Sequence, residues 1–134
     1  MDKKDEQGKR GHILIIDDES DFLYAIQAWM EAKGFMVSAA ENGKVGVEMF
    51  KKVKPDLCFI DILMPEMDGV ETLKELKRIK TDIRVIITSG YSEYEISERF
   101  VGYDVAGFIQ KPYHFEEFSA SLQGVLTASR GDHR

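Results

Sequence analysis

Carboxylates, a hydroxyl and an ammonium group follow four short apolar runs of this sequence, and together they could handle a phosphoryl group. They are Asp17 and Asp18 after Ile13–Ile16, Asp61 after Leu57–Ile60, Thr88 after Ile83–Ile87, and Lys111 after Val105–Gln110. A carboxylate is already ionised at neutral pH, so Asp61 could attack phosphorus without a general base. The ammonium group could neutralise charge that develops on the phosphoryl oxygens, and the hydroxyl could donate a hydrogen bond to one of them.

Three carboxylates gathered in one pocket would repel each other, and a cation is needed to keep them all ionised. Lys111 could supply one positive charge. A hard divalent ion could supply more, and Mg²⁺ suits a site that has few carboxylates and takes further ligands from water and phosphate. Each motif also has an ordinary explanation, because acidic pairs cap helices and Lys-Pro pairs form turns. The order in which these motifs follow successive apolar runs favours a joint site.

The elements that must position these groups are five β-strands that alternate with five helices. The apolar runs predict strands over residues 12–16, 35–39, 57–60, 83–87 and 105–110. We expect Ser20, Asn42, Asp68 and Ser92 to cap the helices that follow the first four strands. Gly46 lies inside a helical pattern, and a close approach between helix and sheet would explain it. This alternation predicts an α/β fold with a parallel sheet between two helical layers, and the carboxyl ends of parallel strands meet at one edge.

Composition narrows the class of protein. The chain has 134 residues, which predicts a single domain, with residues 1–11 as a flexible leader, 12–128 as the folded domain and 129–134 as a flexible tail. A net charge of −6 argues against direct binding to nucleic acid. The single cysteine, Cys58, lies in an apolar run and is interpreted as a buried, inert thiol. We find no membrane-spanning run and no signal peptide, so a cytoplasmic location without direct membrane contact is the expectation.

The combined motifs resemble the receiver domain of two-component response regulators. They are Ile13–Glu19, Asp61–Gly69, Thr88 and Lys111-Pro112, and the resemblance extends from about His12 to Ala128. It implies a flavodoxin-like (CheY-like) three-layer sandwich with strand order 2-1-3-4-5 and five helices. It also implies that Asp61 accepts a phosphoryl group from a phosphohistidine on a sensor histidine kinase or a histidine phosphotransfer protein. The domain would not be an enzyme acting on other molecules, because it would catalyse only its own phosphorylation and slow dephosphorylation.

The same resemblance implies a role for each site residue. Asp18, Asp61 and the backbone carbonyl of Leu63 would hold Mg²⁺, and Asp17 would act largely through water. Thr88 and Phe108 match the switch residues of the family. Lys111 matches its phosphate-binding lysine, and the Lys111–Pro112 peptide bond would be cis. Phosphorylation would then change the surface formed by the fourth helix, the fifth strand and the fifth helix.

Other positions bear on the lifetime and the setting of the signal. Leu63 and Gly90, two residues after Asp61 and Thr88, have no polar side chain that could orient an attacking water, so we predict slow hydrolysis of the aspartyl phosphate. Residues 88–92 and 107–113 resemble receivers attached to hybrid sensor kinases. The sequence leaves open the cognate kinase, the output, a stand-alone or larger parent protein, and dimerisation through the fourth-helix and fifth-helix face.

Two rival functions are weighed against signalling. One is a Mg²⁺-dependent phosphatase or phosphotransferase that acts on small molecules through an aspartyl intermediate. Against it, no second carboxylate follows Asp61 by two residues to act as acid and base. The other rival is an interaction module of the same fold that is never phosphorylated, although every residue that the chemistry needs is present.

Overall fold

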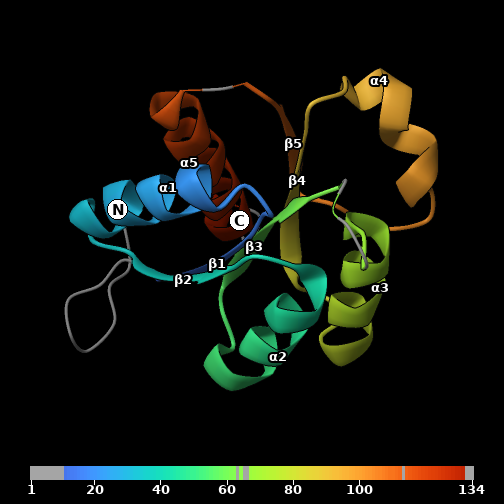
Figure 1. Ribbon diagram of the computed structural model, residues 1–134, viewed down its shortest axis with the longest axis horizontal. Helices are drawn as coiled ribbons and strands as arrows, with labels where there is room; N and C mark the ends of the chain where they lie inside the picture. The colour runs from blue at the N-terminus through green and yellow to red at the C-terminus, as the bar shows by residue number, and fades with distance from the viewer. Residues whose placement is uncertain (1–10, 63, 65–66, 113, 132–134) are drawn as a thin grey trace.

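The computed structural model describes residues 11–62, 64, 67–112 and 114–131. Five parallel strands form one sheet in the order β2-β1-β3-β4-β5, which confirms the predicted fold (Figure 1). The elements are β1 (His12–Ile16), α1 (Ser20–Ala32), β2 (Met36–Ala40), α2 (Gly43–Val53), β3 (Leu57–Asp61), α3 (Gly69–Ile79), β4 (Arg84–Ser89), α4 (Glu93–Ile96), the 3-10 helix η1 (Ser97–Phe100), β5 (Gly107–Gln110) and α5 (Phe115–Gly131). Among these helices, none is long and apolar enough to cross a membrane.

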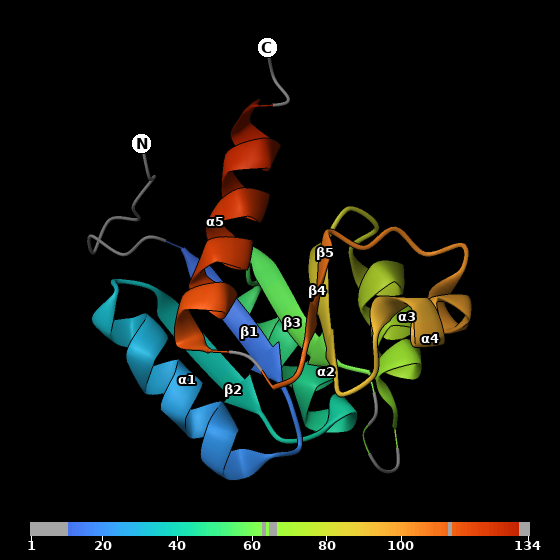
Figure 2. The ribbon, with the colours of Figure 1, turned by 90° about the horizontal axis from the view of Figure 1, so that it is seen from above.

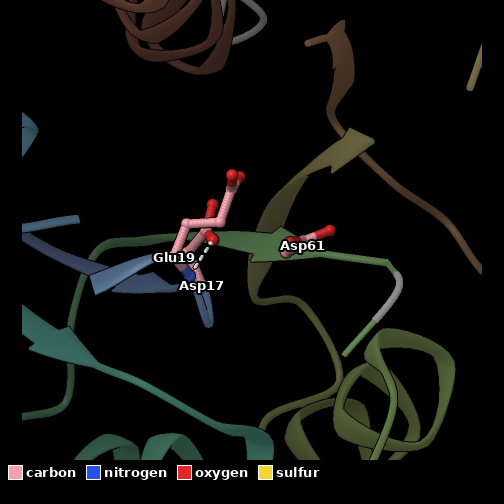
Figure 3. A group of neighbouring side chains, drawn as sticks. All are labelled: Asp17, Glu19 and Asp61. Carbon is pink, nitrogen blue, oxygen red and sulfur yellow. Dashed lines mark hydrogen bonds between the residues drawn. The ribbon is translucent and has the colours of Figure 1, made fainter. Parts of the chain in front are cut away.

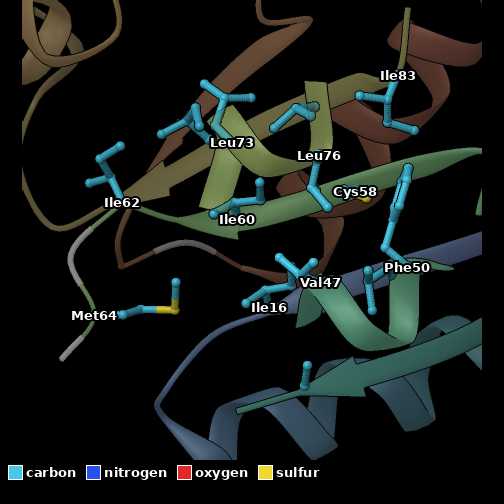
Figure 4. Close-up of a cluster of buried hydrophobic side chains, with 14 of the residues drawn as sticks. Ile16, Val47, Phe50, Cys58, Ile60, Ile62, Met64, Leu73, Leu76 and Ile83 are labelled. Atoms are coloured by element: carbon cyan, nitrogen blue, oxygen red, sulfur yellow. The ribbon is translucent and has the colours of Figure 1, made fainter. Parts of the chain in front are cut away.

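Helices cover both faces of the sheet, with α1 and α5 on one face and α2 and α3 on the other (Figures 1 and 2). Two apolar clusters fill the space between the layers. The α1–α5 cluster contains Ile13, Ile15, Leu23, Ile26, Met30, Phe35, Val37, Leu57, Phe59, Ile86, Ile109, Phe118 and Leu122. The opposite α2–α3 cluster contains Leu14, Ile16, Val47, Phe50, Cys58, Ile60, Leu73, Leu76, Val85, Ile87, Ile96 and Phe100, among others (Figure 4). Neighbouring residues of each central strand therefore enter opposite cores, which explains why these strands read as continuous apolar runs.

Three of the four predicted helix caps are confirmed. The side chains of Asn42, Asp68 and Ser92 each accept a hydrogen bond from a backbone N–H in the first turn of the following helix. The prediction for Ser20 is wrong, because Ser20 is the first residue of α1 and Glu19 occupies the cap position. The Glu19 carbonyl accepts from the Leu23 N–H at 2.9 Å, so the first turn closes one residue earlier than predicted.

Some element boundaries differ from the predicted ones. Strand β2 begins at Met36 because the Phe35 N–H still donates to the Met30 carbonyl at the end of α1. Strand β4 begins at Arg84, after a turn in which the Ile83 N–H donates to the Lys80 carbonyl. Strand β5 starts at Gly107, opposite Ile86. Helix α5 continues to Gly131, past the predicted domain limit at residue 128.

Gly46 lies where α2 approaches the sheet closely, as the sequence suggested. A Cβ atom at this position would lie 2.5 Å from Ile16 Cδ1, and Ile16 is fully buried. Any larger residue would push α2 away from β1 or move Ile16 out of its position in the α2–α3 cluster. The roughly 1 kcal/mol that glycine costs a helix is therefore offset by the closer packing.

We expect Gly69→Ala to lower the free energy of unfolding by about 2 kcal/mol, because an added methyl group would collide with backbone. A Cβ at Gly69 would lie 2.4 Å from Ile62 Cα and 2.5 Å from the Asp61 carbonyl oxygen. Urea denaturation measures the change. Gly124→Ala is the control, because a Cβ there meets nothing within 4 Å and alanine favours the helix. Equal stabilities for the two variants would contradict the expected crowding.

Candidate functional site

Four of the predicted site residues lie on one face of the sheet at the carboxyl ends of their strands. They are Asp17, Asp61, Thr88 and Lys111. Side chains alternate between faces along a strand, so a residue shares the face of the residue two positions earlier. Those earlier residues are Ile15, Phe59, Ile86 and Ile109, and all four belong to the α1–α5 cluster. The predicted site residues therefore converge at the end of this cluster, as the order of the motifs suggested.

The ammonium group of Lys111 forms ion pairs with three carboxylates of this site. Its Nζ lies 2.8 Å from Asp17 Oδ2, 3.1 Å from Asp61 Oδ2 and 2.6 Å from Glu19 Oε1. Burial lowers the pKa of Lys111, but its hydrogen bonds to Asp17 and Glu19 and the charges of Asp17 and Asp61 outweigh burial and leave the pKa raised. Lys111 is therefore an ammonium ion at neutral pH.

Asp17 and Asp61 are both buried, with 2% and 6% of their surfaces exposed. The turn after β1 fixes Asp17, because its Oδ1 accepts a hydrogen bond of 2.9 Å from the Glu19 backbone N–H. Asp61 is the last residue of β3 and pairs in register with Thr88 of β4, which fixes the position of its backbone. Burial of two carboxylates is costly unless they are paired, and Lys111 supplies the pairing.

Thr88 stands beside Asp61 in the sheet. The two residues are direct partners in the β3–β4 ladder, and the Ile62 N–H donates to the Thr88 carbonyl at 2.9 Å. Thr88 is buried, with 2% of its surface exposed. Side chains of directly paired residues point to the same face of the sheet, so the Thr88 and Asp61 side chains share a face. They come from neighbouring strands, whose backbones lie about 4.8 Å apart.

One group of carboxylates is suited to a metal ion. Asp17, Glu19 and Asp61 each offer one oxygen, and these oxygens lie within 4.8 Å of one another (Figure 3). An all-oxygen set of carboxylates fits Mg²⁺. Glu19 was not predicted as a site residue, although its place two residues after Asp17 in an acidic run was a signal for it.

The other two predicted metal ligands are Asp18 and Leu63, and over the residues that it describes the structure does not place either of them in this group of carboxylates. Asp18 is exposed and lines the mouth of the site, and its carboxylate is not part of the group formed by Asp17, Glu19 and Asp61. After β1 it is the carboxylate of Glu19, and not that of Asp18, that contacts Lys111. The backbone carbonyl of Leu63 lies outside the described residues. The roles assigned to Asp18 and Leu63 stay predictions.

Phe108 lies on the opposite face of the sheet from Thr88. It pairs with Ile87 in the β4–β5 ladder, and its half-buried side chain packs against the α2–α3 cluster. The ring of this predicted switch residue therefore already has apolar neighbours. The Lys111–Pro112 peptide bond is cis, as the resemblance implied.

An open cavity of about 680 Å³ leads to the Asp61 carboxylate. Its lining consists of Asp18, Glu19, Phe22, Asp61, Gly90, Tyr91, Lys111 and Pro112. These residues come from the loop after β1, from α1 and from the carboxyl ends of β3, β4 and β5. A group that enters from solvent can therefore reach Asp61 and Lys111 together.

The chain is similar in sequence and in structure to known proteins. The chain is 32% identical to the regulatory protein AtoC of Escherichia coli over 85% of this chain and 25% of that protein. It is 32% identical to the transcriptional regulatory protein ZraR of Klebsiella oxytoca over 92% of this chain and 28% of that protein. It also resembles a response regulator receiver domain protein from Clostridium thermocellum, with 26% identity, a TM-score of 0.79, and coverage of 89% of this chain and 96% of the other.

The chain spans about a quarter of the length of AtoC and ZraR, so the comparison concerns one domain of those proteins. The family of response regulator receiver domains matches residues 13–123, which is most of the chain. Phosphorylation-based two-component signalling is the general function of this family. The fold, the convergence of acidic residues on Lys111 and the family match lead to one conclusion: this chain belongs to the response regulator receiver domains.

Proposed function

We propose that Asp61 of this receiver domain accepts a phosphoryl group from a phosphohistidine on a sensor histidine kinase or a histidine phosphotransfer protein. The observation that carries the proposal is the position of Lys111 Nζ, which is 3.1 Å from Asp61 Oδ2 and 2.8 Å from Asp17 Oδ2 at the end of an open cavity. A buried carboxylate beside a fixed ammonium group is suited to bind and stabilise a phosphoryl group.

The transfer breaks one bond and forms another. A carboxylate oxygen of Asp61 forms a bond to phosphorus as the phosphorus–nitrogen bond of phosphohistidine breaks. The bonding electron pair passes to the imidazole nitrogen, which then takes a proton from water. Lys111 offsets the charge on the phosphoryl oxygens, and the Thr88 hydroxyl donates a hydrogen bond to one of them. Asp61 needs no general base because it is already an anion.

Mg²⁺ would be held by Asp18, Asp61 and the Leu63 carbonyl, as the family resemblance implies, and Asp17 would act on the ion largely through water. When bound, the ion supplies positive charge that neutralises the phosphoryl oxygens. The Asp17 and Asp61 oxygens fit this use because they are carboxylates of one small group.

Phosphorylation would change the surface formed by α4, β5 and α5. The Thr88 hydroxyl would move toward the phosphoryl group, and the adjacent part of β4 would then favour a different packing of Phe108. Helix α4 is a single turn continued by η1, so it is suited to move. Phosphate must favour one of two packings for this surface to act as a switch, and a kinase partner or a second copy of the chain could read it.

The test is the intact mass of the protein after incubation with Mg²⁺ and acetyl phosphate. We expect one added phosphate on the wild type and none on Asp61→Asn, because an amide oxygen cannot form the acyl phosphate. Asp56→Asn is the control. Asp56 directly precedes the first residue of β3, at the end of the strand opposite Asp61, so we expect this variant to be phosphorylated like the wild type. A wild type that gains no phosphate from acetyl phosphate or a phosphohistidine donor would refute the proposal.

A further inference from the structure

Glu19 takes part in the site in a way that the transfer to Asp61 does not require. Its Oε1 lies 2.6 Å from Lys111 Nζ, which is the shortest of the three contacts of that ammonium group with carboxylates. An ammonium group has three N–H donors. Asp17, Glu19 and Asp61 therefore supply one acceptor for each donor, and an incoming phosphoryl oxygen must displace one of them.

The three acceptors differ in how easily they can be displaced. The side chains of Asp17 and Asp61 are only 3% and 8% exposed, and they extend from the ends of β1 and β3. The Glu19 side chain is 62% exposed and reaches Lys111 from the rim of the cavity. Glu19 can return to water at little cost, whereas Asp17 or Asp61 would lose its contact with Lys111 and still be buried. Glu19 is thus the acceptor that an entering phosphoryl group would replace.

From this geometry we infer that Glu19 is a positioning residue, which holds Lys111 in place until a phosphodonor displaces the Glu19 carboxylate. This inference rests on the proposed phosphorylation of Asp61. While Glu19 holds Lys111, its carboxylate also stands in the path of anionic donors. Glu19 therefore slows phosphorylation by small donors. Figure 3 shows the Glu19 side chain extending from the turn after β1 beside Asp17, with Asp61 at the end of β3.

The test compares the phosphorylation rates of wild type and Glu19→Gln at saturating Mg²⁺. Two donors are used: acetyl phosphate, and phosphoramidate, which carries less negative charge at pH 7. We expect Glu19→Gln to react roughly fivefold faster with acetyl phosphate, because one negative charge near the donor is removed. The gain with phosphoramidate should be smaller. A role of Glu19 in folding alone would not make the gain depend on the charge of the donor.

Asp21→Asn is the matched control, because Asp21 is exposed in the first turn of α1 and is not among the residues that contact Lys111 in the described part of the chain. It should react within twofold of the wild type. Glu19→Gln at or below the wild-type rate would overturn the inference, and so would an equal gain in Asp21→Asn or an equal gain with both donors. A wild type that takes no phosphate would instead refute the phosphorylation of Asp61, so the two failures are distinguishable.

Discussion

Lys111→Met should reduce the rate of phosphorylation by acetyl phosphate by about 100-fold or more, and it should also destabilise the fold. Methionine replaces the apolar stem of the lysine but removes the charge that contacts Asp17 and Asp61. The phosphoryl group then loses a fixed cation, and removal of one such electrostatic partner typically costs about 10²–10³ in rate. Phosphate incorporation over time, followed by intact mass, measures this loss.

The loss of stability follows from burial. Lys111→Met leaves the Asp17 and Asp61 carboxylates buried without their counter-ion, and breaking a buried ion pair costs roughly 3–5 kcal/mol. The pKa of Lys111 is raised in the folded state, so its stabilisation is fully present below its ordinary pKa of about 10.4 and is lost only as the pH rises through the higher folded value. Urea denaturation at pH 7 therefore measures the full difference.

Lys74→Met provides the control for Lys111→Met. Lys74 is exposed on α3, so its loss removes one positive charge without uncovering a buried carboxylate. We expect its stability and phosphorylation rate to stay close to those of the wild type. Phosphorylation of Lys111→Met within tenfold of the wild-type rate would contradict the role given to the ammonium group.

The convergence on Lys111 could be predicted because it depends on strand periodicity and sheet direction. Each apolar run marks a buried strand, and all parallel strands end at the same edge. Asp61 and Thr88 then become neighbours as soon as β3 pairs with β4. The register was not needed to foresee the cluster, since Asp17, Asp61 and Thr88 directly follow their apolar runs and Lys111 directly follows the fifth predicted strand.

The part played by Glu19 could not be read from the acidic run alone. Three consecutive acids follow β1, and only the local turn decides which of them reach the site. Asp17 accepts from the Glu19 N–H, which closes the turn and leaves Asp18 exposed. Similarly, the failed prediction for Ser20 reflects a first helical turn that closes at Glu19. Such turns depend on a few hydrogen bonds between neighbours, and side-chain type alone does not determine which of them form.

The boundaries of the strands were less predictable than their existence. Phe35 and Ile83 are apolar and buried like strand residues, yet their N–H groups bond to the preceding helix end or turn. Both side chains still enter the apolar clusters on either face of the sheet. The hydrophobic pattern of a sequence indicates which residues are buried, but it does not indicate which backbone group each N–H donates to.

Gly90→Glu should shorten the lifetime of the phosphorylated protein by about 10- to 100-fold. In the wild type, Leu63 and Gly90 have no polar side chain that could orient an attacking water, so hydrolysis is expected to be slow. Gly90 lines the cavity that leads to Asp61, and a Cβ there meets nothing within 4 Å. A glutamate can therefore be added without crowding. Its carboxylate would accept a hydrogen bond from water and direct that water at phosphorus.

Gly90→Ala separates this chemical effect from the effect of removing a glycine. It adds the same Cβ and has no polar atom, so we expect its phosphate to last as long as in the wild type within about twofold. The measurement is the loss of phosphate, by intact mass, from protein freed of donor in the presence of Mg²⁺. A wild-type half-life of seconds would contradict slow hydrolysis. Equal lifetimes for Gly90→Glu and Gly90→Ala would show that this rim of the cavity does not control the access of water, and the duration of the signal would then depend on residues other than Gly90.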